Sequence, residues 1–189
     1  MNILISGRKQ SGKTTLAGFL EEKLAENNIH SETLSLAQPI KEIVCELWGA
    51  PMGDMTQASD LDREEIKNIM HPCGKTYREL LVYVGEFMRK LDPDVWVNDL
   101  LRRIEESYAN YIFIPDVRFP NEIEKLGGKS IRLTRKISDD NDETEIALDN
   151  YHDFDYIIEN DNIPENMKNV RGWWVMQDIL DKEMKCDEQ

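Results

Sequence analysis

Short apolar runs alternate along the chain with longer segments whose apolar residues recur at helical spacing. The short runs are typical of β-strands and lie at residues 2–6, 32–36, 111–114, 130–134 and 155–159. The longer segments predict helices at residues 15–24, 39–48, 61–70, 76–89, 93–104, 121–126 and from 164 onward. Strands that alternate with helices predict an α/β fold with a parallel sheet, whose ligands bind at the carboxyl ends of the strands.

The turn after the first predicted strand carries a phosphate-binding pattern. Gly7-Arg8-Lys9-Gln10-Ser11-Gly12-Lys13-Thr14 matches G-x-x-x-x-G-K-[ST] and stands between a strand and a helix, as a P-loop does. Its glycines allow backbone angles that a Cβ would forbid, so N–H groups can turn toward an anion at the positive end of the following helix. We expect Lys13 to reach the β- and γ-phosphates of ATP and the Thr14 hydroxyl to bind Mg²⁺. The alternative is a glycine-rich turn that only caps the helix.

Composition and charge narrow the range of partners. A chain of 189 residues suits one domain, and its net charge of −14 disfavours binding to nucleic acid or to an anionic membrane. A local group of Lys and Arg can still bind a small anion. The cysteines, Cys45, Cys73 and Cys186, lack metal-ligand spacing, and no apolar run approaches membrane-spanning length. We therefore expect a cytoplasmic protein that acts on small molecules.

An acidic residue follows the buried strand at 111–114. In a P-loop protein the carboxylate that holds Mg²⁺, directly or through water, falls at this position, which is Asp116 here. Arg118 lies two residues on, so it shares a face with Asp116 in an extended segment and could clamp a phosphate. The alternatives are that Asp116 caps the short helix at 121–126 and that Arg118 forms an ion pair with Glu122.

Further cations lie at predicted strand ends and on one helix. Lys41 follows the second strand, and Arg135 follows the fourth. Arg78 and Arg89 are eleven residues apart, so they lie on roughly the same side of their helix. A single Lys or Arg is most often a surface charge. Their joint placement favours an anion-binding site.

The order of these motifs resembles that of the phage deoxynucleoside monophosphate kinases, a family of P-loop kinases. The matching stretches are 4–7 with 11–14, 36–41, 78–81 with Gly85 and Arg89, 94–97, 116–122, 144–145 with 148–149, and 155–161. Two positions depart from the family: Val82 stands where it tends to place Gln, and Thr14 where several relatives carry Asp. Dephospho-coenzyme A kinases and phosphomevalonate kinases share much of this layout, so the acceptor stays open.

The resemblance implies a P-loop NTPase three-layer sandwich over residues 1–189, with helices on both faces of a five-stranded parallel sheet of order 2-3-1-4-5. It also implies an acceptor-binding helical region at about 38–100 and a lid-like loop at about 135–153. The residues expected to hold ATP are Gly7, Ser11, Gly12, Lys13, Thr14 and Thr15. The expected catalytic residues are Lys13, Arg118 and Arg135, the acceptor-binding residues Lys41, Arg78, Arg89 and Asp116, and the Mg²⁺ ligands Thr14 and Asp116.

The reaction expected from this resemblance is transfer of the ATP γ-phosphoryl group to a deoxynucleoside monophosphate, by a monomer or a homodimer. A phosphate monoester has a second pKa of about 6, so the acceptor needs no general base, and the sequence has no evident catalytic histidine. A rival from another class is a nucleotide-dependent binding module that uses the P-loop as a switch. A polynucleotide kinase is a third alternative, and the net charge of −14 counts against it.

Overall fold

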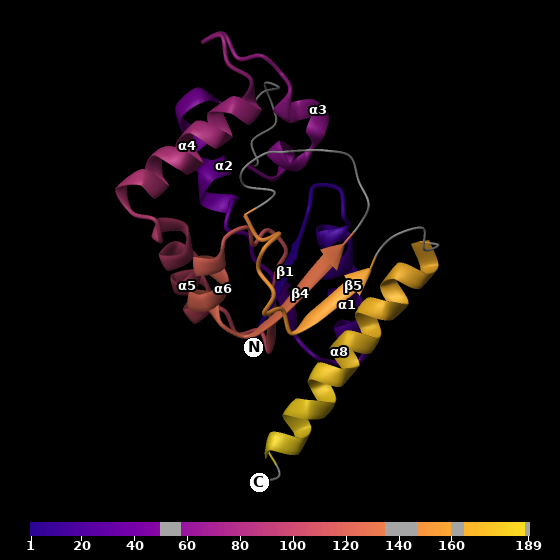
Figure 1. Cartoon of the computed structure of the whole chain (residues 1–189). Coiled ribbons are helices and arrows are strands. Elements are labelled where there is room, and N and C mark those ends of the chain that lie inside the picture. Colours follow the sequence, from indigo (N-terminus) through magenta and orange to yellow (C-terminus); the bar gives the residue numbers. More distant parts are fainter. Residues whose placement is uncertain (50–57, 135–146, 160–164, 188–189) are drawn as a thin grey trace. The chain divides into compact units, whose positions relative to one another are not determined.

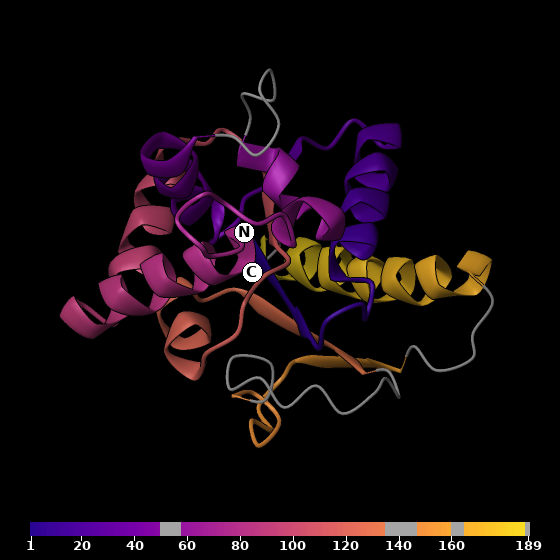
Figure 2. The ribbon, with the colours of Figure 1, turned by 90° about the horizontal axis from the view of Figure 1, so that it is seen from above.

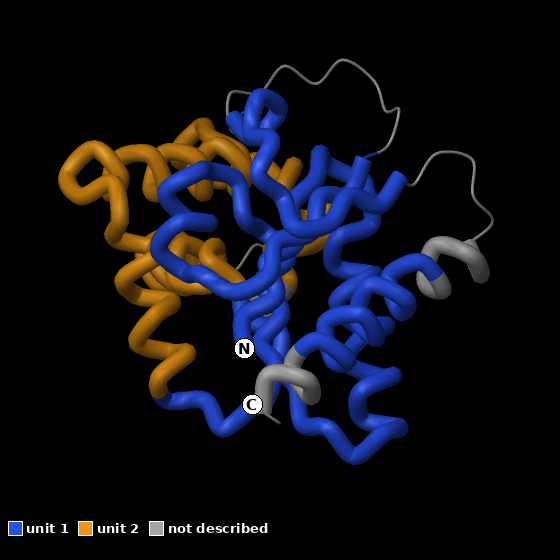
Figure 3. Tube along the Cα trace, turned by 60° about the horizontal axis from the view of Figure 1, so that its bottom comes forward, with its two compact units in different colours: residues 1–34, 106–189 blue, residues 35–105 orange. Residues whose placement is uncertain are grey.

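The computed structural model describes residues 1–49, 58–134, 147–159 and 165–187. The chain forms two compact units, which Figure 3 colours separately. The first, called the sheet unit here, consists of Met1–Leu34 and Glu106–Gln189, and the second, called the helical unit, is Ser35–Glu105. The acceptor-binding region expected at about 38–100 lies within the helical unit.

A five-stranded sheet forms the centre of the sheet unit (Figure 1). Its strands are β1 (Asn2–Gly7), β2 (Ser31–Thr33), β3 (Tyr111–Ile114), β4 (Lys129–Thr134) and β5 (Tyr156–Glu159). All neighbours are parallel, in the order β2-β3-β1-β4-β5, which confirms the expected fold and strand order. β1 is therefore the central strand, and its carboxyl end leads directly into the P-loop.

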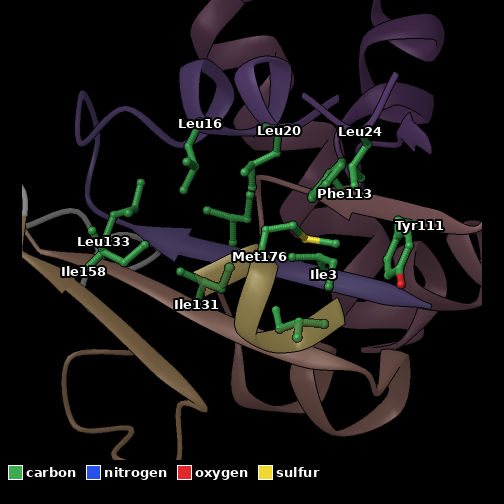
Figure 4. Close-up of a cluster of buried hydrophobic side chains, with 13 residues drawn as sticks. Ile3, Leu16, Leu20, Leu24, Tyr111, Phe113, Ile131, Leu133, Ile158 and Met176 are labelled. Carbon is green, nitrogen blue, oxygen red and sulfur yellow. The ribbon is translucent and has the colours of Figure 1, made fainter. Parts of the chain in front are cut away.

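Helices α1 (Lys13–Glu26) and α8 (Glu165–Asp187) pack against each other on one face of the sheet (Figure 2). Their apolar side chains meet those of alternate strand positions (Figure 4). This core consists of Ile3, Ile5, Leu16, Ala17, Leu20, Leu24, Tyr111, Phe113, Ile131, Leu133, Ile158, Met176 and Ile179. Gly172 permits the close approach of the two helices, because a Cβ there would lie 2.2 Å from Leu16 Cδ1. The short helix α6 (Pro120–Leu126) also belongs to this unit and buries Ile123 and Leu126.

The helical unit has its own small core. It contains α2 (Gln38–Trp48), the 3₁₀-helix η1 (Ala58–Asp62), α3 (Glu64–Lys67), α4 (Tyr77–Leu91) and α5 (Val95–Glu106). Its buried cluster is Val44, Leu61, Ile66, Tyr77 and Leu80. α4 begins at a capping box in which Thr76 and Glu79 satisfy each other's backbone N–H groups. The predicted helices of this region are thus present, except for the one at 61–70.

Two expectations about local structure need correction. The predicted helix at 61–70 is broken into η1 and α3, because Arg63 is extended (φ −77°, ψ 128°) and its N–H donates to Asp60 O. The strand predicted at 32–36 ends at Thr33, where Ser35 Oγ accepts the N–H of Ala37 and turns the chain toward α2.

The lid-like loop expected at about 135–153 lies outside the described residues up to residue 146, and residues 147–150 form turns. Among the helices described, none is long and apolar enough to cross a bilayer.

Candidate active site

The P-loop lies between β1 and α1, as the sequence predicts. Gly12 has a left-handed backbone with φ +95°, and Gln10 has φ +60°, so the chain reverses sharply before the helix begins at Lys13. Gly7 packs against β4: a Cβ there would lie 2.7 Å from the backbone oxygen of Leu133 and 2.6 Å from Ser11 Oγ. The loop is therefore held tightly against the neighbouring strand β4, and the loop residue Ser11 is buried.

Lys13 is folded onto its own loop. Its ammonium donates to the backbone oxygens of Gly7 at 2.5 Å and Arg8 at 2.8 Å. The N–H of Ser11 donates to that same Arg8 oxygen at 3.1 Å, which closes the turn. The ammonium thus stands in the first turn of the loop, where phosphate oxygens could replace carbonyl oxygens as its acceptors. The two threonines that follow, Thr14 and Thr15, are exposed at the start of α1.

The turn after β3 carries Asp116 and Arg118, both half-buried. Glu122 caps the start of α6, the role considered as the alternative for Asp116: it is buried and accepts the backbone N–H of Arg118 at 2.7 Å and of Phe119 at 3.0 Å. Glu122 thus fixes the backbone of Arg118. A hydroxyl and a carboxylate are ligands that suit Mg²⁺, so Thr14 and Asp116 fit the expected metal by chemistry. The described residues contain no group of three or more His, Cys, Asp or Glu side chains that could hold a metal without a nucleotide.

The helical unit gathers three cations around two carboxylates. Lys41 is buried, and its Nζ lies 2.6 Å from Asp62 Oδ1. Arg78 pairs with Glu64 and also donates to the side-chain oxygen of Asn68. Lys67 Nζ lies 3.7 Å from the same Glu64 carboxylate.

Lys67 was not among the site residues predicted from the sequence. Burial is the main cause that lowers the pKa of its ammonium, and the cations Arg78 and Lys41 lower it further. Glu64 and Asp62 raise the pKa without reversing the shift. Lys67 is therefore close enough to Lys41 and Arg78 for their positive charges to repel its own. In the sequence, Lys67 appears only as a lysine near the end of the predicted helix at 61–70. Its contacts depend on the break at Arg63, which the helical spacing does not show.

Two further predicted site residues are Arg89 and Arg135. Arg89 lies along α4 beside Gly85: its Nη1 is 3.5 Å from where a Cβ of Gly85 would be. The Trp96 indole donates to the Gly85 oxygen at 3.3 Å, which joins α4 to α5. Arg135, expected in the lid-like loop, lies outside the described residues.

The family model described as phosphomevalonate kinase matches residues 5–130, which is more than half of the 189 residues. The uncharacterized protein ORF77 of Ictalurid herpesvirus 1 (strain Auburn) is 34% identical over 97 residues, covering 46% of this chain and 42% of that protein. The chain thus matches less than half the length of this curated relative. The crystal structure of shikimate kinase from Bacteroides thetaiotaomicron is similar over 96% of this chain and 98% of its own, with 16% identity and a TM-score of 0.44.

Proposed function

Because the chain belongs to the phosphomevalonate kinase family, we propose that it transfers the γ-phosphoryl group of ATP to a small acceptor that already carries a phosphate. The family match covers the P-loop as well as Lys41, Lys67, Arg78 and Asp116. It therefore spans residues of both the donor side and the acceptor side of the proposed reaction.

The cation group of the helical unit carries this proposal. Three like charges placed close together are unfavourable in a fold unless an anion or a carboxylate offsets them. Here Asp62 and Glu64 offset Lys41, Lys67 and Arg78. Both carboxylates are 46% or more exposed, so an incoming phosphate can compete for the cations they contact. A second anion-binding group outside the P-loop is what a kinase with a phosphorylated acceptor requires.

On the donor side, Lys13 would exchange the oxygens of Gly7 and Arg8 for phosphate oxygens. Mg²⁺ held by Thr14 and Asp116 would neutralise charge on the transferred group. Arg118, whose backbone is fixed by Glu122, is the candidate for a further contact with that group. The acceptor phosphate is itself an anion at neutral pH, so these residues have only to orient and neutralise the two reactants.

The acceptor that we propose first is a deoxynucleoside monophosphate, which the order of the sequence motifs favours. Phosphomevalonate is the second candidate, and the family match over residues 5–130 favours it. Both carry a phosphate monoester, so the same cations of the helical unit would serve either. A nucleotide-dependent switch module remains the rival from another class, and it would not need the cation group.

The experiment that tests this proposal is ADP release from Mg-ATP by the full chain. Each deoxynucleoside and ribonucleoside monophosphate, phosphomevalonate and dephospho-coenzyme A is added in turn, with a sample without acceptor as the control. Stimulation by deoxynucleotides supports the first acceptor, and stimulation by phosphomevalonate alone supports the second. If every phosphorylated acceptor leaves the rate at the control level while Mg-ATP still binds, the proposed kinase activity is wrong and the switch module is favoured.

A further inference from the structure

The two residues that flank Gly7, Ser6 and Arg8, both contact members of one partly buried ion pair, Arg132–Asp149. Arg132 donates from Nη1 to Ser6 Oγ at 2.9 Å and from Nη2 to Asp149 Oδ1 at 2.7 Å. The other oxygen of that carboxylate, Oδ2, accepts from Arg8 Nη2 at 2.5 Å. Because Ser6 and Arg8 lie on either side of Gly7, these bonds and the backbone close a ring around the start of the P-loop.

Arg132 is the fixed member of this ring. Its side chain is 10% exposed, it stands opposite Ser6 on the neighbouring strand, and its Cζ lies 5.7 Å from the centre of the Phe154 ring. A buried guanidinium depends strongly on its carboxylate partner. Asp149 is therefore held in place by Arg132, and by the burial of its neighbour Leu148, and it offers its second oxygen to the loop.

Arg8, which donates to Asp149, also takes part in the hydrogen bonds that shape the P-loop. The backbone oxygen of Arg8 accepts both the Ser11 N–H and the Lys13 ammonium. Backbone N–H dipoles that converge on an anion site repel one another until the anion arrives. A contact that holds the loop in its closed turn reduces the free energy of ordering it on binding.

We propose that Asp149 is a positioning residue that holds the P-loop, through Arg8, in the shape that receives the triphosphate of Mg-ATP. This inference rests on the proposed function only in that it takes the P-loop as the nucleotide site. It does not depend on which acceptor is used.

The test is the affinity of Asp149→Asn for Mg-ATP, measured by isothermal titration calorimetry without an acceptor. The amide has one oxygen, and its orientation toward the buried Arg132 leaves the NH₂ group facing Arg8. The substitution therefore breaks the contact with Arg8 and spares the contact with Arg132. We expect the dissociation constant for Mg-ATP to rise about tenfold, the loss expected when a binding loop must be ordered anew.

Asp155→Asn is the matched control. Asp155 is also a carboxylate that accepts several bonds from β4, namely from Lys129 Nζ and from the N–H and hydroxyl of Ser130, but it does not contact the P-loop residues. We expect it to lower the melting temperature at least as much as Asp149→Asn does. Its affinity for Mg-ATP should stay within about twofold of wild type, a difference below 0.5 kcal/mol by the relation of free energy to affinity.

A double-mutant cycle and hydrogen exchange separate positioning from a general loss of stability. If Asp149 acts through Arg8, Asp149→Asn should have no further effect on Mg-ATP affinity in an Arg8→Gln background. Amide exchange in the peptide over residues 7–13 should be faster in Asp149→Asn, with β5 and α8 unchanged.

The results that would contradict the role of Asp149 differ from those that would contradict the proposed function. An Asp149→Asn protein with wild-type affinity overturns the inference alone, and so does an equal loss in Asp155→Asn or an undiminished effect in the Arg8→Gln background. If the wild-type chain binds no Mg-ATP, the inference and the proposed function are both wrong.

Discussion

The sheet unit and the helical unit hold their site cations by different kinds of contact. In the sheet unit, Lys13 donates to two backbone oxygens of its own loop, so its position follows from the local chain. In the helical unit, Lys41, Lys67 and Arg78 contact side-chain carboxylates on η1 and α3, which are five and four residues long. A site set by backbone geometry is encoded in a short motif. A site set by side chains on short helices depends on how those helices pack.

The largest expected effect tests the backbone-held cation. Lys13→Ala removes the ammonium from the loop, and we expect acceptor-dependent ADP release to fall about 10²–10³-fold, as when a charge-stabilising donor is lost. We expect its melting temperature to change little, because Lys13 is only part-buried and its hydrogen bonds are with oxygens of its own loop. The control is Lys23→Ala on the same helix, where the ion pair with Glu26 is largely exposed. Equal turnover in Lys13→Ala and Lys23→Ala would remove Lys13 from the mechanism.

This contrast also explains how much of the fold and of the candidate site could be predicted from the sequence. The strand at 111–114 and the P-loop were predicted with their residues, because a short apolar run and a glycine-containing motif specify local backbone. The place of Lys67 was not predictable, since it depends on the break at Arg63, where the helical spacing of 61–70 continues without a visible stop. The same holds for Asp149 and Arg132, which are 17 residues apart and meet only when β4 and the segment after it are folded. Arg132 in a predicted strand of a parallel sheet was a visible sign, because such strands are buried and a buried charge requires a partner.

A second prediction tests how tightly the backbone of the sheet unit is constrained. Gly7→Ala places a Cβ 2.7 Å from the Leu133 backbone oxygen, so either the loop or β4 must move. We expect the free energy of unfolding to fall by about 1–3 kcal/mol, the range for overpacking, together with loss of Mg-ATP binding. Gly18→Ala is the control: it lies inside α1, where nothing beyond the adjacent residues and the helix's own backbone lies within 4 Å of its would-be Cβ, and should stabilise by about 0.5–1 kcal/mol. Urea unfolding of both variants measures this, and equal stability of the two would show that the close contact at Gly7 is unimportant.

A third prediction tests the helical unit, where the cations are held by side chains. Lys67→Met removes a cation whose pKa is lowered chiefly by burial and further by Arg78 and Lys41. A lowered lysine pKa means that the charged form opposes folding at neutral pH, so the variant should be as stable as wild type or more so. We expect the KM for the acceptor to rise about tenfold, as for a lost hydrogen bond to a charged group, with the KM for ATP unchanged. The control is Lys90→Met at the exposed end of α4, and a Lys67→Met enzyme with the acceptor KM of that control would contradict the role of Lys67.

The smallest expected effect concerns a carboxylate of the sheet unit that supports structure alone. Burial opposes ionisation of Asp155, but Lys129 and the N–H and hydroxyl of Ser130 outweigh it, so the pKa of this carboxyl lies below its ordinary value. A lowered carboxyl pKa contributes stability above the unfolded-state pKa, and that stability is lost as the pH falls through the folded-state pKa. Asp155→Asn should therefore cost about 1 kcal/mol at pH 7, and the difference from wild type should shrink steadily as the pH is lowered below about 4. Urea unfolding across this pH range measures it. A difference that stays constant down to pH 3 would mean that packing of Asp155, and not its charge, holds β4 to the segment before β5.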